Sequence, residues 1–127
     1  MIDVVAAIIF NEGNILLARR ALHKSLAGKW ELPGGKIELN ESPEAALKRE
    51  LKEEFNISIR VNEHFKTVEH KYDNFSIRLI SYYAEYLDGE FILTDHDLYA
   101  WVEVSKLYDY DLAEADKPIA DDLVKSS

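Results

Sequence analysis

Apolar residues recur along the chain mostly with the alternating period of β-strands. Residues 4–10 form a short run rich in β-branched side chains, residues 11–14 are a turn cluster, and residues 15–20 resume the run, which predicts a hairpin with a buried first strand. Residues 75–86 carry apolar side chains on both alternating faces, so we expect a central strand that is covered on both sides. Further strands are predicted at 30–32, 58–61, 64–72, 91–93 and 99–104.

A helical period replaces the alternation in the middle of the chain and again at its end. Leu47, Leu51 and Phe55 recur every four residues and make an apolar stripe that must face a core. Ser42 suits the N-cap and Pro43 suits the first helical position, so this helix should begin at about residue 43. Two further helices are predicted, at 105–108 and 117–125.

Length and composition narrow the class of protein. With 127 residues the chain is expected to be one domain. The formal net charge of -9 argues against a binder of nucleic acid polymers, which needs a basic face to neutralise phosphates. Zero cysteines exclude a disulfide framework and a Cys-ligated zinc site. No segment is long and apolar enough for a membrane span or a signal peptide, so we expect a cytoplasmic protein.

Three carboxylates lie on one face of the central helix. Glu50, Glu53 and Glu54 are spaced i, i+3 and i+4, about a quarter turn from the apolar stripe, so they should lie at the rim of a cleft. Like charges at this spacing cost a few tenths of a kcal/mol per pair unless a cation offsets them. Mg²⁺, which takes oxygen ligands and keeps substrate phosphates in its shell, would do so. The alternative is an ordinary solvated acidic face.

The residues around this face resemble the signature of the Nudix hydrolase family. Gly35 is followed after five residues by Glu41, after seven more by Arg49-Glu50-Leu51, and after one more by Glu53-Glu54. Residues 30–38 resemble the loop of the MutT-type branch, and residues 4–20 and 112–118 resemble its CTP pyrophosphohydrolase and 8-oxo-dGTP diphosphatase members. The family glycine near the end of the motif is Asn56 here. Asn is the next most tolerant residue of a left-handed helix end, so we expect intact chemistry.

The resemblance implies a fold and an activity. The fold is an α/β/α sandwich with a mixed, curled sheet between two helices, as one Nudix domain over 1–127 with its motif at 35–57. The activity is Mg²⁺-dependent hydrolysis of a nucleoside triphosphate to the monophosphate and pyrophosphate, with Mn²⁺ able to substitute. The expected substrates are CTP, dCTP or a modified dNTP such as 8-oxo-dGTP. Alternatives are the same chemistry on a nucleotide sugar or ADP-ribose, and a non-catalytic domain that binds a nucleotide. The partner is a small nucleotide, and the protein is a monomer or a homodimer.

The resemblance also assigns roles around the metal. The expected metal ligands are the Gly34 carbonyl, Glu50, Glu53, Glu54 and, from a later loop, Asp95. Asp95 is equally well read as a turn residue, with Asp97 as its replacement in the site. Glu50 is the expected general base, with Asp95 or an ion-activated water as alternatives. Gly35, Glu41 and Arg49 are expected to support the motif structurally.

Three residues are expected to contact the nucleotide. Arg20 falls where the family has a substrate-contacting arginine, although it could equally end a strand in solvent. Lys36 is a candidate phosphate partner or a surface lysine. Asp116 falls where the family reads the base, since a carboxylate can accept from the cytosine amino group or from the guanine N1-H and amino group. Its alternative role is to cap the terminal helix.

Overall fold

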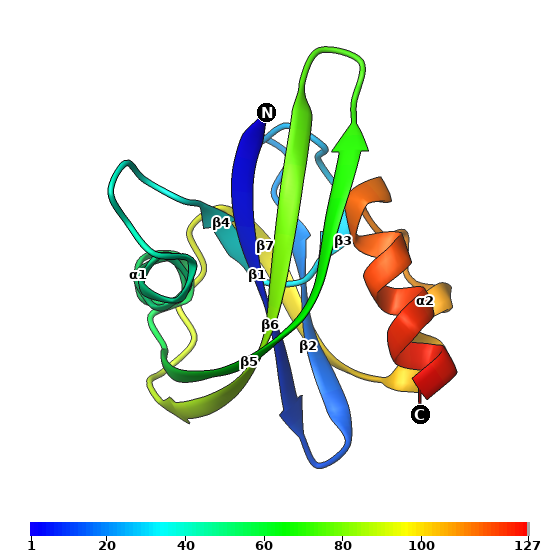
Figure 1. The fold of residues 1–127 in the computed structure, drawn as a ribbon. Coiled ribbons are helices and arrows are strands. Elements are labelled where there is room, and N and C mark those ends of the chain that lie inside the picture. Colours follow the sequence, from blue (N-terminus) through cyan, green and yellow to red (C-terminus); the bar gives the residue numbers. More distant parts are fainter. Residues whose placement is uncertain (127) are drawn as a thin grey trace.

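Within residues 1–126, which the computed structural model describes, seven strands form one mixed sheet between two helices (Figure 1). The strands are β1 Ile2–Asn11, β2 Asn14–Arg20, β3 Trp30–Glu31, β4 Gly34–Lys36, β5 Ser58–Lys71, β6 Ser76–Asp88 and β7 His96–Glu103. The helices are α1 Pro43–Phe55 and α2 Lys117–Ser126, with the short 3-10 helices η1 Val104–Asp109 and η2 Glu114–Asp116 before α2. The predicted α/β/α sandwich is confirmed.

The sheet runs in the order β3-β2-β1-β6-β5, with β7 on the free edge of β2 and β4 beside β1. The pairing of β1 with β6 is parallel and the other strand pairs are antiparallel, so the sheet is mixed. The start of β1 pairs with β4 and its end pairs with β2. This change of partner along one strand separates β2, β3 and β7 from the remaining strands.

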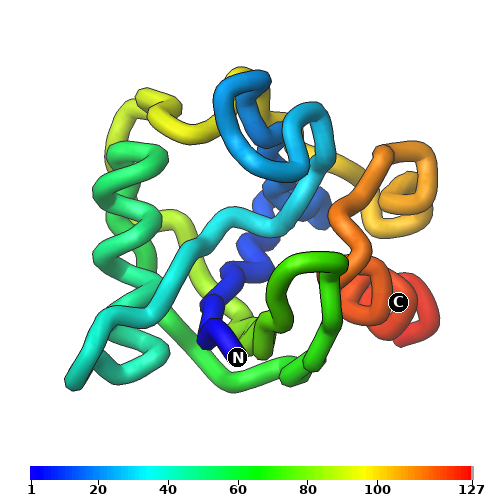
Figure 2. Tube along the Cα trace, turned by 90° about the horizontal axis from the view of Figure 1, so that it is seen from above, coloured from blue at the N-terminus to red at the C-terminus, as the bar shows by residue number. Residues whose placement is uncertain are grey.

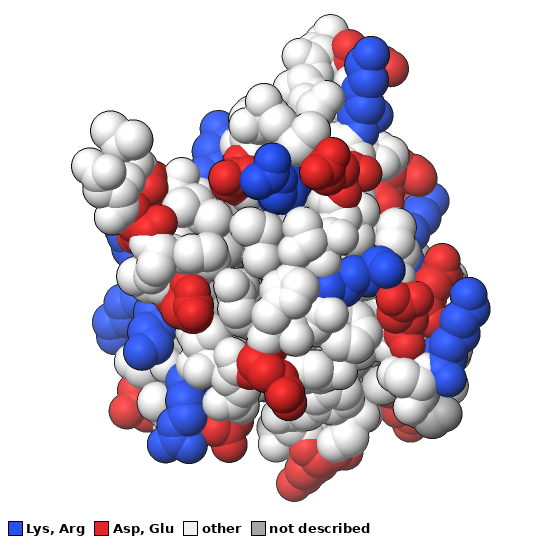
Figure 3. All heavy atoms as spheres, in the orientation of Figure 1, with Lys and Arg blue, Asp and Glu red and all other residues white. Residues whose placement is uncertain are grey.

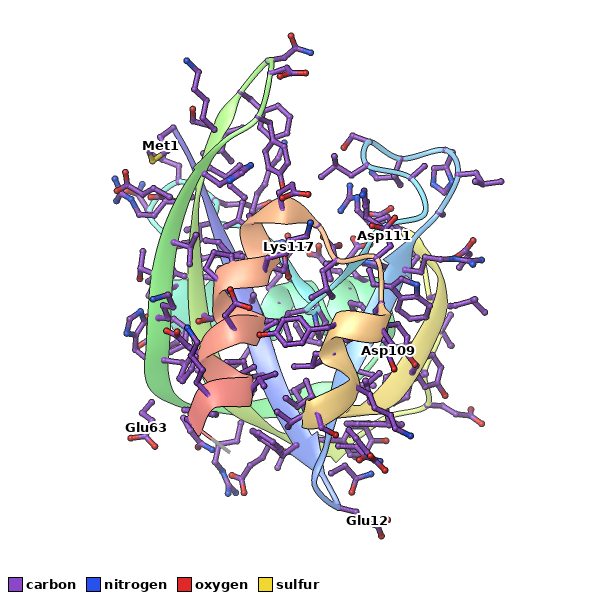
Figure 4. All side chains as sticks on the ribbon, turned by 90° about the vertical axis from the view of Figure 1, so that its right-hand side faces the viewer. Met1, Glu12, Glu63, Asp109, Asp111 and Lys117 are labelled. Atoms are coloured by element: carbon purple, nitrogen blue, oxygen red, sulfur yellow. The ribbon has the colours of Figure 1, made fainter. Side chains whose placement is uncertain are left out.

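Each face of the sheet has its own core. On one face, α1 contributes Leu47, Leu51 and Phe55, all with no exposed surface, which confirms the predicted apolar stripe. On the other face, Leu107 of η1 and Ile119 of α2 pack in one core with residues of the sheet such as Ile15. Figure 2 shows α1 and α2 on opposite sides of the sheet, and Figure 4 shows α2, which begins at Lys117, lying beside η1, which ends at Asp109.

The predicted strand at 91–93 is wrong. Instead of joining the sheet, this segment crosses the end of α1, where Ile92 N-H donates to the Phe55 carbonyl over 3.1 Å and Thr94 N-H donates to the Glu54 carbonyl over 3.2 Å. The last carbonyls of a helix have no partner within the helix, so they compete successfully for the donors of a passing chain. The strands predicted at 58–61 and 64–72 are one strand, β5, whose register shifts where the gap was expected.

Acidic and basic side chains are interspersed over the face of the molecule seen in Figure 3. In the described part of the chain, every helix is too short or too polar to cross a membrane.

Candidate active site

Both ends of α1 are fixed by local contacts. Ser42 Oγ accepts from the Ala45 N-H over 3.1 Å, and Pro43 is the first helical residue, as predicted. At the other end Asn56 adopts the left-handed conformation with φ of 59°, and its side-chain amide donates to the Glu90 carbonyl over 3.0 Å. Asn56 therefore performs the backbone role of a glycine and gains a hydrogen bond that glycine cannot make.

The helix presents the three predicted carboxylates as one cluster. Glu50, Glu53 and Glu54 each offer an oxygen, and these oxygens all lie within 4.8 Å of one another. Glu54 Oε2 is buried and has no hydrogen-bond partner among residues 1–126. A buried carboxylate oxygen without a donor is costly, and a cation would remove that cost. The all-oxygen donor set fits a hard divalent ion.

Arg49 holds the cluster against the loop that precedes the helix. Its guanidinium donates to Glu41 over 2.7 and 3.0 Å, to Glu50 over 3.0 Å and to Glu53 over 3.2 Å. It also donates to the Lys36 carbonyl over 2.9 Å. The hydrogen bonds from Arg49 lower the pKa of Glu41 to about 2, and a hydrogen bond from the Glu38 N-H adds to the shift. Arg49 and Glu41 therefore form a brace between α1 and β4.

The glycines of the loop let the helix approach closely. A Cβ on Gly35 would lie 2.3 Å from the Glu50 carboxyl carbon, so only glycine leaves room for that carboxylate. A Cβ on Gly34 would lie 1.8 Å from the Val5 carbonyl oxygen of the neighbouring strand. The two glycines thus bring β4 into contact with β1 on one side and with the acidic face of α1 on the other.

Asp95 joins the acidic face from the loop before β7. It shares a hydrogen bond with Glu54, and the Lys24 ammonium lies 3.6 Å from its carboxylate. Burial and this contact raise the pKa of Glu54 to about 7. Burial alone would raise the pKa of Asp95, but the shared hydrogen bond and Lys24 bring it below its ordinary value. Burial also raises the pKa of Glu50, although the hydrogen bond from Arg49 opposes the shift.

Asp97 lies outside this group. Its carboxylate accepts two hydrogen bonds from Arg19, over 2.8 and 2.9 Å, on a solvent-exposed part of the sheet. The structure thus brings Asp95 and not Asp97 to the carboxylates of α1.

A cavity of about 400 Å³ lies next to the glycine loop. Its polar lining includes Arg20, Ser25, Glu31, Lys36 and Asp116, and its apolar lining includes Ile2, Val4, Leu26, Tyr72, Phe75, Ile77 and Leu79. Gly34 and Gly35 form the wall toward α1, so the cavity abuts the acidic cluster. The three residues expected to contact a nucleotide therefore line one space.

Two of those residues are fixed by hydrogen bonds to the protein, of which the Asp116 bond is buried. Arg20 donates from Nε to the Ser25 carbonyl over 2.6 Å and from Nη1 to Glu31 over 3.0 Å. Asp116 is 6% exposed and accepts from the Leu32 N-H over 2.9 Å, so its side chain caps no helix. Burial and the Glu31 charge raise the pKa of Asp116 well above its ordinary value. Asp116 is thus a cavity residue that favours its neutral form.

Sequence reasoning missed several cavity residues. The rings of Tyr72 and Phe75 stack at 5.0 Å at the tip of the β5–β6 hairpin, which extends beyond the body of the molecule at the top of Figure 1. The Tyr72 hydroxyl accepts from the Ala115 N-H over 3.2 Å and so ties the hairpin to η2. Two aromatic residues on either side of a turn are a usable sequence signal. Glu31, by contrast, gave no such signal.

Known proteins are similar to this chain in sequence and in fold. Residues 4–122 match the family model described as NUDIX domain. The chain is 38% identical over 119 residues to the CTP pyrophosphohydrolase of Escherichia coli (strain K12), and the match covers 94% of this chain and 88% of that protein. The chain is 34% identical over 119 residues to the 8-oxo-dGTP diphosphatase of the same strain, and that match covers 93% of this chain and 92% of that protein. The crystal structure of the MutT protein from Methanosarcina mazei Go1 superposes with a TM-score of 0.89 at 29% identity, covering 98% and 94%.

Proposed function

The chain belongs to the NUDIX domain family, and from that membership we propose that it hydrolyses a nucleoside triphosphate to the monophosphate and pyrophosphate with the help of Mg²⁺. The observation that carries the proposal is the contact between the acidic cluster of α1 and the cavity, through Gly35. A nucleoside triphosphate needs both parts, because its base packs against apolar walls while its phosphates need a cation to neutralise their charge. The two relatives from Escherichia coli, named for CTP and for 8-oxo-dGTP, support this class of substrate.

The donor set supports the choice of metal. Glu50, Glu53, Glu54, Asp95 and the Gly34 carbonyl would supply oxygen ligands, which Mg²⁺ requires and which Mn²⁺ also accepts. When bound, the ion neutralises phosphate oxygens and makes water a better nucleophile. Without it the cluster holds more negative charge than Arg49 can offset.

The residues of the chain then divide the work. Glu50 lies against the glycine loop with a raised pKa, and a carboxylate closer to neutrality is a better acceptor for the proton of the attacking water. The oxygen of that water forms a bond to phosphorus while the bridging bond between the α- and β-phosphates breaks. Arg20 and Lys36 bind the phosphates of the substrate. Arg49 and Glu41 keep the carboxylates in place.

Asp116 is the proposed contact to the base. In its neutral form the carboxyl offers one donor and one acceptor, which suits the edge of cytosine or of an oxidised guanine. The Tyr72 and Phe75 rings supply an apolar wall for the base. We therefore propose CTP, dCTP or a modified dNTP such as 8-oxo-dGTP as substrate, drawn from the cytoplasmic nucleotide pool.

A product screen tests the proposal. The protein is incubated with Mg²⁺ and, in turn, CTP, dCTP, 8-oxo-dGTP, UDP-glucose and ADP-ribose, and the products are identified by ³¹P NMR. We expect monophosphate and pyrophosphate from at least one triphosphate, with no turnover in EDTA. Release of inorganic phosphate from the triphosphates, or turnover of UDP-glucose or ADP-ribose only, would contradict the proposal.

A further inference from the structure

A β-bulge between β2 and β7 reverses the direction of one side chain. Arg19 pairs with Leu98 and Arg20 pairs with His96, so Asp97 is the extra residue of β7. Ala100 and Val102 pack into the core under α2, and regular alternation would place His96 on that same face. The bulge instead turns His96 toward α1, where its ring lies 5.0 Å from the ring of Phe55.

His96 meets the cavity wall through a shared carboxylate oxygen. His96 Nε2 lies 2.8 Å from Glu31 Oε2, and Arg20 Nη1 lies 3.0 Å from the same oxygen. Because a carboxylate oxygen only accepts, the imidazole donates from Nε2. Among residues 1–126 the other ring nitrogen of His96 has no hydrogen-bond partner. The orientation of the ring is therefore set by its packing against Phe55 and by its hydrogen bond to Glu31.

The three side chains form a line from α1 to the cavity that is buried at His96 and partly exposed at the other two residues. The His96 side chain is 3% exposed, Glu31 is 16% exposed and Arg20 is 20% exposed. Arg20 and Glu31 line the cavity, whereas His96 does not. They come from three strands, β7, β3 and β2, so no local sequence pattern places them together.

We propose that His96 and Glu31 are positioning residues that hold the Arg20 guanidinium in the wall of the nucleotide cavity. This inference rests on the proposed function for the contact between Arg20 and the nucleotide. A guanidinium held at one end by Ser25 and at the other by an oriented Glu31 loses little freedom when phosphate or base arrives. Without the His96 donor, Glu31 can rotate, and binding must then order both side chains.

The experiment separates the hydrogen bond from the packing. His96→Leu fills the space against Phe55 but cannot donate, whereas His96→Gln keeps a donor. We expect His96→Leu to raise KM for the triphosphate about fivefold with kcat within about twofold, and His96→Gln to restore most of the loss. Glu31→Gln should raise KM at least as much, and adding His96→Leu to it should have little further effect.

The same bulge supplies the control. Arg19→Gln removes the exposed pair with Asp97 on the other face and should leave KM unchanged. Thermal melting followed by circular dichroism shows whether each variant folds, and if His96→Leu does not fold, the KM of Glu31→Gln decides. Equal KM values for wild type and His96→Leu, or equal KM values for the Leu and Gln variants, overturn the inference.

Failure of the proposed function would be visible separately. If the wild type hydrolyses no triphosphate, that function is wrong, and the positioning role is then measured by calorimetry as the affinity for CMP. A weaker affinity in His96→Leu than in His96→Gln supports the inference, and equal affinities reject it.

Discussion

The acidic face of α1 and the cavity beside it are built in different ways. The three carboxylates lie within five positions of one helix, so the helical period alone brings them together. The cavity wall combines residues of β1, β2, β3, β4 and β6 with the loop at 21–29, the tip of the β5–β6 hairpin and η2. The proposed metal site is therefore local in the sequence, whereas the proposed nucleotide site depends on the whole fold.

The two regions also treat their acids differently. Glu41, next to Arg49, has its pKa lowered to about 2 by the hydrogen bonds that it accepts. The pKa of Asp116 is raised, because burial and the Glu31 charge both disfavour its ionised form. One carboxyl group is used as a fixed charge and the other as a group that can donate and accept. Substitutions in the two regions should separate turnover, base preference and stability.

The largest expected effect is on turnover. Glu53→Gln keeps the shape of the side chain and removes its charge from the acidic face. We expect kcat to fall by about 100-fold or more, because the ion loses a ligand, while the unfolding temperature changes little. Steady-state kinetics in Mg²⁺ and thermal melting measure the two. A wild-type rate for this variant would remove Glu53 from the metal site.

Gly35→Ala tests the contact between the two regions. The added Cβ would lie 2.3 Å from the Glu50 carboxyl carbon, so Glu50 must move. We expect kcat to fall about 10- to 100-fold, as for other changes that displace the support of a metal ligand. Gly13→Ala is the control for the stability cost of replacing a glycine, because Gly13, with φ of 83° in the turn between β1 and β2, does not line the cavity. Full activity of Gly35→Ala would show that the position of Glu50 matters little.

A substitution in the cavity should change base preference more than turnover. Asp116→Asn keeps an acceptor for the Leu32 N-H and removes the acid. We expect the ratio of kcat/KM between CTP and UTP to change by about tenfold, which corresponds to one hydrogen bond. The rate with the poorer base should change less. An unchanged ratio across all bases would remove Asp116 from the base contact.

The smallest expected effect is a change in stability. Glu41→Gln should lower the unfolding temperature by a few degrees at pH 7, because the carboxylate is ionised and bound to Arg49. A folded pKa of about 2 below the ordinary value of 4.5 means that this contribution is present above about pH 4.5 and is lost as the pH falls toward 2. Melting curves of both proteins between pH 2 and 7 should therefore converge at the acid end.

Features that depend on residues close together in the sequence could be predicted, whereas features that depend on distant residues could not. The start of α1 at Pro43, the left-handed Asn56 and the clustering of Glu50, Glu53 and Glu54 all follow from local rules, and the structure agrees. The segment at 91–93 looked like a strand because its apolar run carries no sign that the end of a distant helix will bind it. Likewise, nothing near Glu31 or His96 in sequence reveals that a bulge brings them together.

We propose that the acidic face of α1 binds a divalent cation, and a direct titration tests this. Mn²⁺ is titrated into the metal-free protein and free Mn²⁺ is followed by electron paramagnetic resonance, in wild type, Glu53→Gln and, as a control from the first turn of the same helix, Glu44→Gln. We expect Glu53→Gln to weaken Mn²⁺ binding by at least about tenfold and Glu44→Gln to match the wild type. Equal Mn²⁺ affinity in all three proteins would contradict it.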